Sequence, residues 1–128
     1  MKKIVCLFKR KASLTHAEFR AYYEASHVKL AHKHLGAFMA DYRRNYIQDV
    51  FGIPTEDLAG GVSGFDYDCV TEIWFNSDED YQEWMRAVGD PVIGGEFIED
   101  EHNFIDRESF IMTICDEVSS PAEVLKND

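Results

Sequence analysis

The clearest pattern in the chain is a set of apolar side chains at helical spacing over residues 14–30, which predicts an amphipathic helix. Thr15 is a favourable N-cap residue, and Glu18, three positions later, completes a capping box. The helical pattern fades toward Gly36, where we expect the helix to end, because glycine is common just beyond a helix C-terminus.

Three ring side chains lie four residues apart on the inward face of this helix: Phe19, Tyr23 and His27. That spacing stacks them along one line. A histidine there is either a core residue with a satisfied hydrogen bond or a proton-transfer group at a cavity wall. We place His27 near the helix C-terminus, where the macrodipole favours the imidazolium while burial favours the neutral ring. Opposed effects leave a titration near neutrality, which suits a general acid or base.

Alternating and continuous apolar patterns predict four strands, over residues 3–9, 38–48, 69–75 and 104–115. The second strand would turn five side chains toward the core: Phe38, Ala40, Tyr42, Arg44 and Tyr46. The third would place Val70, Glu72 and Trp74 on one face. A second helix is expected after the N-cap Ser77, and a shorter one over residues 92–101. The long loop Ile53–Asp68 is a candidate lid.

The element order β-α-β-β-α-β predicts a ferredoxin-like α+β fold, a four-stranded antiparallel sheet with both helices on one face. We assign residues 1–116 to one domain and residues 117–128 to a polar tail. Several strands are apolar on both faces, so the face without helices needs another cover. A second copy of the chain is the simplest candidate.

The composition of the chain limits the kinds of partner and the cellular location that we expect. With 45% hydrophobic and 13% aromatic residues the chain is globular, and its net charge of −11 argues against binding to nucleic acid. The longest apolar run, Ile4–Phe8, is too short to cross a membrane, and no signal-peptide pattern follows it. The three cysteines (Cys6, Cys69 and Cys115) fit buried free thiols, so we expect a cytoplasmic protein.

Four segments together resemble the EthD-like members of the dimeric α+β barrel superfamily: KRKASLTHAEF (9–19), FRAYYEASHVKLA (19–31), TEIWF before NSDEDY (71–81) and EDEHNFID (99–106). The resemblance implies a homodimer whose sheets pack face to face, and a pocket between each sheet and its helices. Relatives in the superfamily include cofactor-free monooxygenases, aromatic polyketide cyclases, dehydratases and decarboxylases.

Several candidate site residues have structural interpretations as well. Glu72 is costly among apolar neighbours unless it is paired, with Arg44 the expected partner, or faces a wet cavity that holds a substrate. Tyr42, Tyr46 and Trp74 either line a pocket for an aromatic ligand or pack in the core.

We expect no metal site and no cofactor. His32 and His34 are two residues apart and lie on different helical faces, and no carboxylate completes a facial triad with His27. The sequence leaves the role of His102 open. It contains no glycine-rich phosphate loop and no nucleophile elbow.

The resulting hypothesis is a small cofactor-independent enzyme acting on an aromatic or polyketide-like carbonyl compound. His27 would transfer the proton in a cavity lined by Tyr23, Tyr42, Tyr46 and Trp74, while Arg44 or Glu72 orients the substrate. Cyclisation, dehydration, decarboxylation and cofactor-free oxygenation are all compatible with this chemistry. The alternatives are a binding or accessory protein of an oxygenase pathway, and a structural dimer with a solid core.

Overall fold

Four antiparallel strands build the sheet of this protein, seen in a computed structural model that describes residues 2–52 and 64–126. The sheet order is β2-β3-β1-β4. The strands are β1 (Lys2–Arg10), β2 (Asp41–Tyr46), β3 (Cys69–Trp74) and β4 (Ile105–Asp116). The candidate lid falls mostly outside the described residues.

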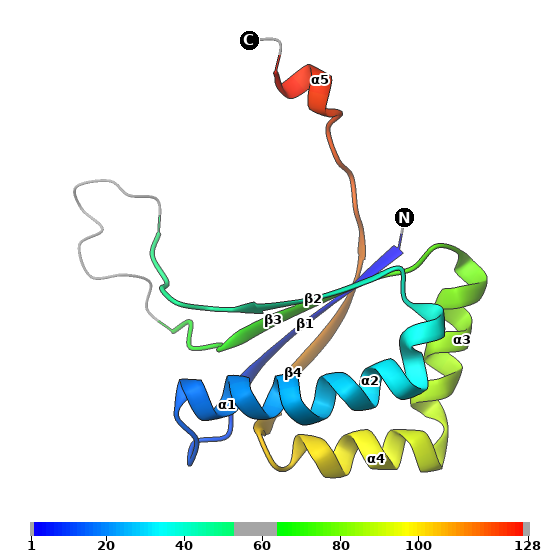
Figure 1. Ribbon diagram of the computed structural model, residues 1–128. Helices are drawn as coiled ribbons and strands as arrows, with labels where there is room; N and C mark the ends of the chain where they lie inside the picture. The colour runs from blue at the N-terminus through cyan, green and yellow to red at the C-terminus, as the bar shows by residue number, and fades with distance from the viewer. Residues whose placement is uncertain (1, 53–63, 127–128) are drawn as a thin grey trace.

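Two long helical segments cover one face of this sheet (Figure 1). The first helical segment runs through α1 (His16–Tyr22), a π-helical turn η1 (Tyr23–His27), α2 (Val28–Leu35) and a 3-10 turn η2 (Gly36–Phe38). The second comprises α3 (Asp78–Gly89) and α4 (Pro91–Glu101), and a short α5 (Ala122–Leu125) follows β4. The predicted α+β fold is therefore confirmed. No helix in the described ranges is long and apolar enough to span a bilayer.

The predicted helix caps are present. The Thr15 hydroxyl accepts a hydrogen bond from the Glu18 backbone N–H, and the Glu18 carboxylate accepts one from Thr15 N–H. The Ser77 hydroxyl accepts a hydrogen bond from the Asp80 backbone N–H at the start of α3, and the Asp90 carboxylate accepts from two backbone N–H groups at the start of α4. These side chains satisfy donors that the first turn of each helix leaves free.

Two boundaries differ from the prediction. Strand β2 is shorter because β3 offers six partners, which run from Trp74 opposite Asp41 to Cys69 opposite Tyr46. Phe38 instead closes the 3-10 turn. Gly36 has a φ of −57°, so it continues a right-handed turn and forms no left-handed cap.

The core lies between the helices and the covered face of the sheet. Side chains alternate along β1, so Ile4, Cys6 and Phe8 are buried under the helices while their neighbours face away. Strand β3 repeats this pattern, with Thr71 and Ile73 under the helices. Cys6 and Cys69 are buried free thiols, as predicted, whereas Cys115 is only half-buried.

Candidate functional site

The π-helical turn between α1 and α2 positions the residues on which the site is built. The backbone N–H of Val28 bonds to the carbonyl of Tyr23, five residues back, and so widens the helix locally. Such turns often occur at functional sites. His27 lies at the end of this turn and helix α2 continues to Leu35, so the predicted position near a helix C-terminus is wrong.

The predicted line of rings is present. The ring centroid of Tyr23 lies 6.3 Å from that of Phe19 and 5.6 Å from that of His27. The imidazole also packs against Phe97 at 5.4 Å and Phe104 at 5.0 Å. His27 is thus held on several sides by aromatic rings, which limits its freedom to rotate.

A carboxylate from the neighbouring helix α4 completes the arrangement. Asp100 Oδ2 lies 2.9 Å from His27 Nδ1. Its other oxygen, Oδ1, accepts hydrogen bonds from the Tyr22 hydroxyl at 2.7 Å and the Ser26 hydroxyl at 2.9 Å. An ionised carboxylate can only accept, so Nδ1 carries the ring proton and Nε2 keeps its lone pair.

Burial lowers the pKa of His27 below its ordinary value of 6.5, and the hydrogen bond to Asp100 partly opposes this shift. The imidazole is therefore neutral at physiological pH. A neutral histidine with a carboxylate behind one nitrogen and a lone pair on the other is the arrangement that a general base requires.

A second carboxylate lies on the other side of the ring. Glu101 Oε2 is 3.9 Å from His27 Nε2, and Arg107 Nε donates to the other oxygen, Oε1, at 3.1 Å. Burial raises the pKa of Glu101, although Arg107 lowers it. The site thus holds a carboxyl group on each side of the His27 ring, with Asp100 at Nδ1 and Glu101 on the side of Nε2.

His27 and Glu101 line a cavity of about 190 Å³ between the helices and the sheet. Other lining side chains are apolar or aromatic and come from both layers, among them Phe8, Ala31, Ile73, Trp84 and Phe97. Of the lining residues, Ile98 on α4 and Met112 on β4 are each 44% exposed, so the cavity opens between these two elements.

Comparison with known proteins agrees with this architecture. The EthD domain family matches residues 11–108. The chain belongs to the EthD family. An EthD-like protein from Ralstonia eutropha aligns with a TM-score of 0.60 and 17% identity, over 95% of this chain and 96% of its own. A protein from Arabidopsis thaliana aligns with a TM-score of 0.55 and 15% identity, over 94% of this chain and 99% of its own.

At these identities the two structures support the EthD fold alone. None of the curated proteins compared with the chain matches it.

In this EthD-family chain, three of the seven predicted site residues line the cavity: Tyr23, His27 and Tyr42. Arg44 and Tyr46 lie on the covered face of the sheet, where both bond to Glu24. The Arg44 guanidinium also stands over the Tyr42 ring, 4.8 Å from its centroid.

Glu72 and Trp74 lie on the opposite face of the sheet, away from the cavity. Lys3 Nζ is 2.7 Å from Glu72 and 4.4 Å from the centroid of the Trp74 ring. The predicted pair between Glu72 and Arg44 is therefore wrong. Arg43 is the residue opposite Glu72 in the register, so Arg44 points to the other face.

The remaining histidines serve other contacts. The rings of His32 and Tyr42 lie 6.1 Å apart, and His34 Nε2 is 2.5 Å from Glu96 Oε2 on α4. His102 is exposed and follows the end of α4. Within residues 2–52 and 64–126, no three His, Cys, Asp or Glu side chains come together as metal ligands.

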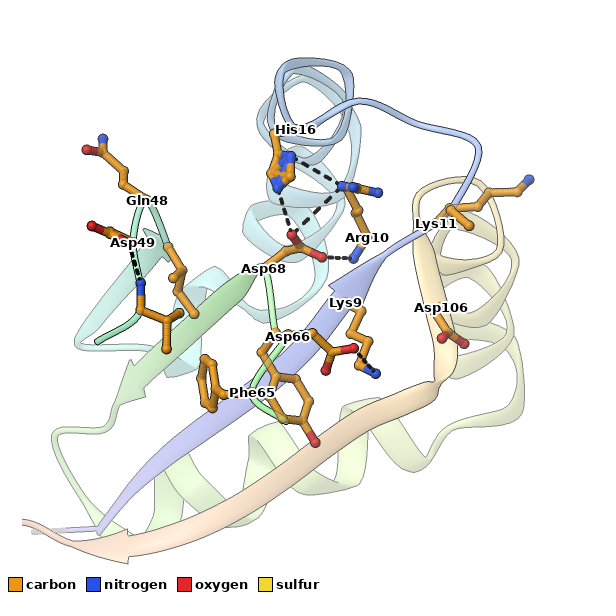
Figure 2. Close-up of a pocket in the computed structure, with 14 residues that line it drawn as sticks. Lys9, Arg10, Lys11, His16, Gln48, Asp49, Phe65, Asp66, Asp68 and Asp106 are labelled. Atoms are coloured by element: carbon orange, nitrogen blue, oxygen red, sulfur yellow. Dashed lines mark hydrogen bonds and ion pairs between the residues drawn. The ribbon is translucent and has the colours of Figure 1, made fainter. Parts of the chain in front are cut away.

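A wider groove lies at the far end of the sheet, and Figure 2 shows its charged side chains. Asp68 accepts from the Arg10 backbone at 2.8 Å and lies 3.2 Å from His16 Nε2, while Lys9 pairs with Asp66. Asp68 thus links the end of β1 to the start of α1, and the Lys9–Asp66 pair links β1 to the segment just before β3. We interpret them as structural.

The most informative residue that sequence reasoning missed is Asp100. It lies 73 positions from His27, and nothing in the local pattern separates it from Glu99 and Glu101. The acidic run before the last strand was the available signal. Thr71 lines the cavity and its hydroxyl lies 2.7 Å from that of Tyr23, but the sequence carries no signal for it because a threonine on a strand is ordinary.

Proposed function

We propose that this EthD-family protein is a small enzyme that works without a cofactor, with His27 moving a proton to or from a carbonyl or phenolic substrate. The observation that carries the proposal is the His27–Asp100 pair at the wall of the cavity, with Nε2 as the nitrogen left for a ligand. A buried histidine that served packing alone would also need a hydrogen-bond partner such as Asp100, but it would not need the adjoining cavity.

The chemistry follows from the protonation states. Neutral His27 takes a proton at Nε2 from an acidic C–H or O–H of the substrate, and the electron pair remains on the substrate as a stabilised anion. The imidazolium that forms lies between Asp100 and Glu101. The two carboxylates stabilise it, and His27 then returns the proton to the product or to water.

Cyclisation, dehydration, decarboxylation and oxygenation can all start from such an anion. Tyr23 and Tyr42 belong to the proposed binding wall because they line the cavity with His27. Arg44 and Tyr46 do not line the cavity, and we propose that they support its wall, Arg44 by packing on Tyr42 and Tyr46 by its hydrogen bond to Glu24. Glu72 and Trp74 lie on the other face of the sheet and have no part in the proposed site.

That other face forms part of the proposal as a homodimer interface. Leu7 stands between Val70 on β3 and Ile111 on β4 in the register, which makes an apolar row across three strands of the face without helices. Two such faces packed together would remove these side chains from water. The cytoplasmic location inferred from the cysteines belongs to the same proposal.

Solvent deuterium exchange into small aryl ketones tests the proton transfer directly. We expect the protein to accelerate exchange at the acidic C–H, and His27→Gln to lower the rate about 100- to 10,000-fold. Asp100→Asn should also lower the rate and move the acid limb of the pH profile to lower pH, because Asp100 raises the pKa of His27.

The matched control is His34→Gln, which removes a histidine that also pairs with a carboxylate but does not line the cavity. Its exchange rate should equal that of the unmodified protein. Unchanged exchange in His27→Gln would refute the catalytic role. A small molecule that co-purifies and stays unchanged on incubation, detected by native mass spectrometry, would favour a binding protein.

A further inference from the structure

A chain of buried hydroxyl groups forms one polar end of the cavity. The Tyr23 hydroxyl lies 2.7 Å from Thr71 Oγ1 and 3.2 Å from the Tyr42 hydroxyl. Thr71 Oγ1 in turn lies 3.7 Å from the Cys69 sulfur. Tyr23, Tyr42 and Thr71 all line the cavity. Thr71 and Tyr23 are almost fully buried, at 3% and 2% exposed.

The number of protons in this row of side chains shows whether it can donate a hydrogen bond to a ligand. The row contains four groups that each carry one proton: the hydroxyls of Tyr42, Tyr23 and Thr71 and the thiol of Cys69. Three contacts join these groups, so one proton has no acceptor within the row. That proton can belong to any one of the four groups, and three of them, Tyr42, Tyr23 and Thr71, line the cavity. An acceptor atom of a ligand beside Tyr42 favours the arrangement in which Tyr42 donates to the ligand. Each of the other groups then donates to its neighbour on the side of Tyr42.

Both phenols keep their protons at neutral pH. Burial raises the pKa of Tyr42 to about 12, and burial raises the pKa of Tyr23 well above its ordinary value. The hydroxyls therefore act as neutral donors. Donors of this kind stabilise an oxygen on which negative charge develops.

The side chain of Tyr23 sets the distance between the base and these donors. Its ring packs on His27 at 5.6 Å between centroids, and its hydroxyl reaches Thr71 and Tyr42. The two polar ends of the cavity, His27 on one side and the hydroxyl groups on the other, are thus separated by about the length of one aromatic ring. The volume agrees, since about 190 Å³ is close to the roughly 150 Å³ of an apolar cavity that holds benzene.

We propose that the Tyr42 hydroxyl, supported by Tyr23 and Thr71, binds the carbonyl or phenol oxygen of a single-ring substrate whose acidic hydrogen faces His27. This inference rests on the proposed function and names its substrate class. In the step, the C–H proton moves to His27 Nε2, the C–H electron pair forms the C=C bond of the enolate, and the π electron pair of the carbonyl moves onto its oxygen. That oxygen becomes an enolate and accepts the Tyr42 hydrogen bond.

Two probes of matched shape test the donor. Acetophenone offers a carbonyl oxygen and an acidic C–H, and α-methylstyrene replaces the oxygen with an apolar CH₂. We expect the protein to bind acetophenone more tightly, measured by titration calorimetry. Tyr42→Phe should weaken acetophenone binding about three- to tenfold and leave α-methylstyrene binding unchanged. Deuterium exchange into acetophenone should slow about tenfold or more, because the bond to the developing anion is charge-assisted.

Tyr81→Phe is the matched control, since Tyr81 is also buried but packs on Phe75 outside the cavity. It should change neither affinity nor exchange. The inference is overturned if the unmodified protein binds the two probes with equal affinity. It is also overturned if Tyr42→Phe binds acetophenone and exchanges its hydrogen as the unmodified protein does.

The two proposals fail separately. Exchange that depends on His27 but not on Tyr42 would leave the proposed function standing and refute the donor. A Tyr42-dependent preference for the carbonyl, without any catalysed exchange, would support the donor site and refute the catalytic role of His27.

Discussion

The behaviour of His27 is decided by two opposed contributions, burial and a carboxylate. Burial is the larger, so its pKa lies below the ordinary 6.5. The cost of burying a charge in low dielectric exceeds what one hydrogen bond to Asp100 returns. The ring is consequently ready to accept a proton at physiological pH.

The same shift makes folding stability depend on pH. Between pH 6.5 and the lower pKa of the folded state, the unfolded chain binds a proton that the folded chain does not. The free energy of unfolding should therefore fall as pH decreases through this window. In His27→Gln this contribution is absent, and the fall should be shallower.

Urea unfolding at pH values from about 8 to about 5 measures both slopes. His34→Gln serves as the control for removal of a histidine that does not line the cavity. Identical pH dependence in His27→Gln and the unmodified protein would contradict the assignment of a lowered pKa to His27.

At the scale of elements, the packing of α4 against α3 depends on one of two adjacent glycines. A Cβ atom added at Gly94 would lie 2.6 Å from the Val88 carbonyl oxygen, whereas one added at Gly95 would meet nothing within 4 Å. The Gly-Gly pair weakens the helical pattern in the sequence, and the close approach to α3 explains why Gly94 is tolerated there.

The two glycines should therefore respond oppositely to alanine. Gly94→Ala forces α3 and α4 apart and should destabilise the protein by about 1–3 kcal/mol. Gly95→Ala should be neutral or stabilising by up to about 1 kcal/mol, because alanine is the better helix former. Chemical unfolding of both variants measures the difference. A Gly94→Ala variant as stable as Gly95→Ala would show that the close approach has no energetic role.

At the scale of the whole molecule, the helices leave one sheet face uncovered (Figure 1). Its apolar row of Leu7, Val70 and Ile111 crosses three strands, and Ile111 is 43% exposed. Lys3, Glu72 and Trp74 form a polar cluster on the same face. Apolar rows flanked by paired charges are typical of interfaces between protein chains.

If that face joins two copies, a charge at its centre should separate them. Leu7→Asp should weaken the dimer about 100-fold or more, since it would bury an unpaired carboxylate. Met85→Asp, on the exposed side of α3, is the control and should leave the dimer intact. Analytical ultracentrifugation at micromolar concentration distinguishes the two, with circular dichroism to verify folding. A monomeric unmodified protein would exclude this interface.

Local signals were sufficient for the elements and their order. The capping box at Thr15, the cap at Ser77 and the spacing of Phe19, Tyr23 and His27 are all decided by neighbours within a few residues. Strand alternation determines which side chains share a face, and the element order leaves few topologies. Membership of the EthD family follows from the same segments.

The site itself was decided by contacts between distant parts of the chain. Asp100 meets His27 across 73 positions, and Thr71 meets Tyr23 across 48. Sequence patterns predicted that Glu72 would pair with Arg44, but the register places the two on opposite faces. The hollow beside His27 also depends on the volumes of packed side chains from both layers. Periodicity determines the direction of a side chain, and only tertiary packing determines what it meets.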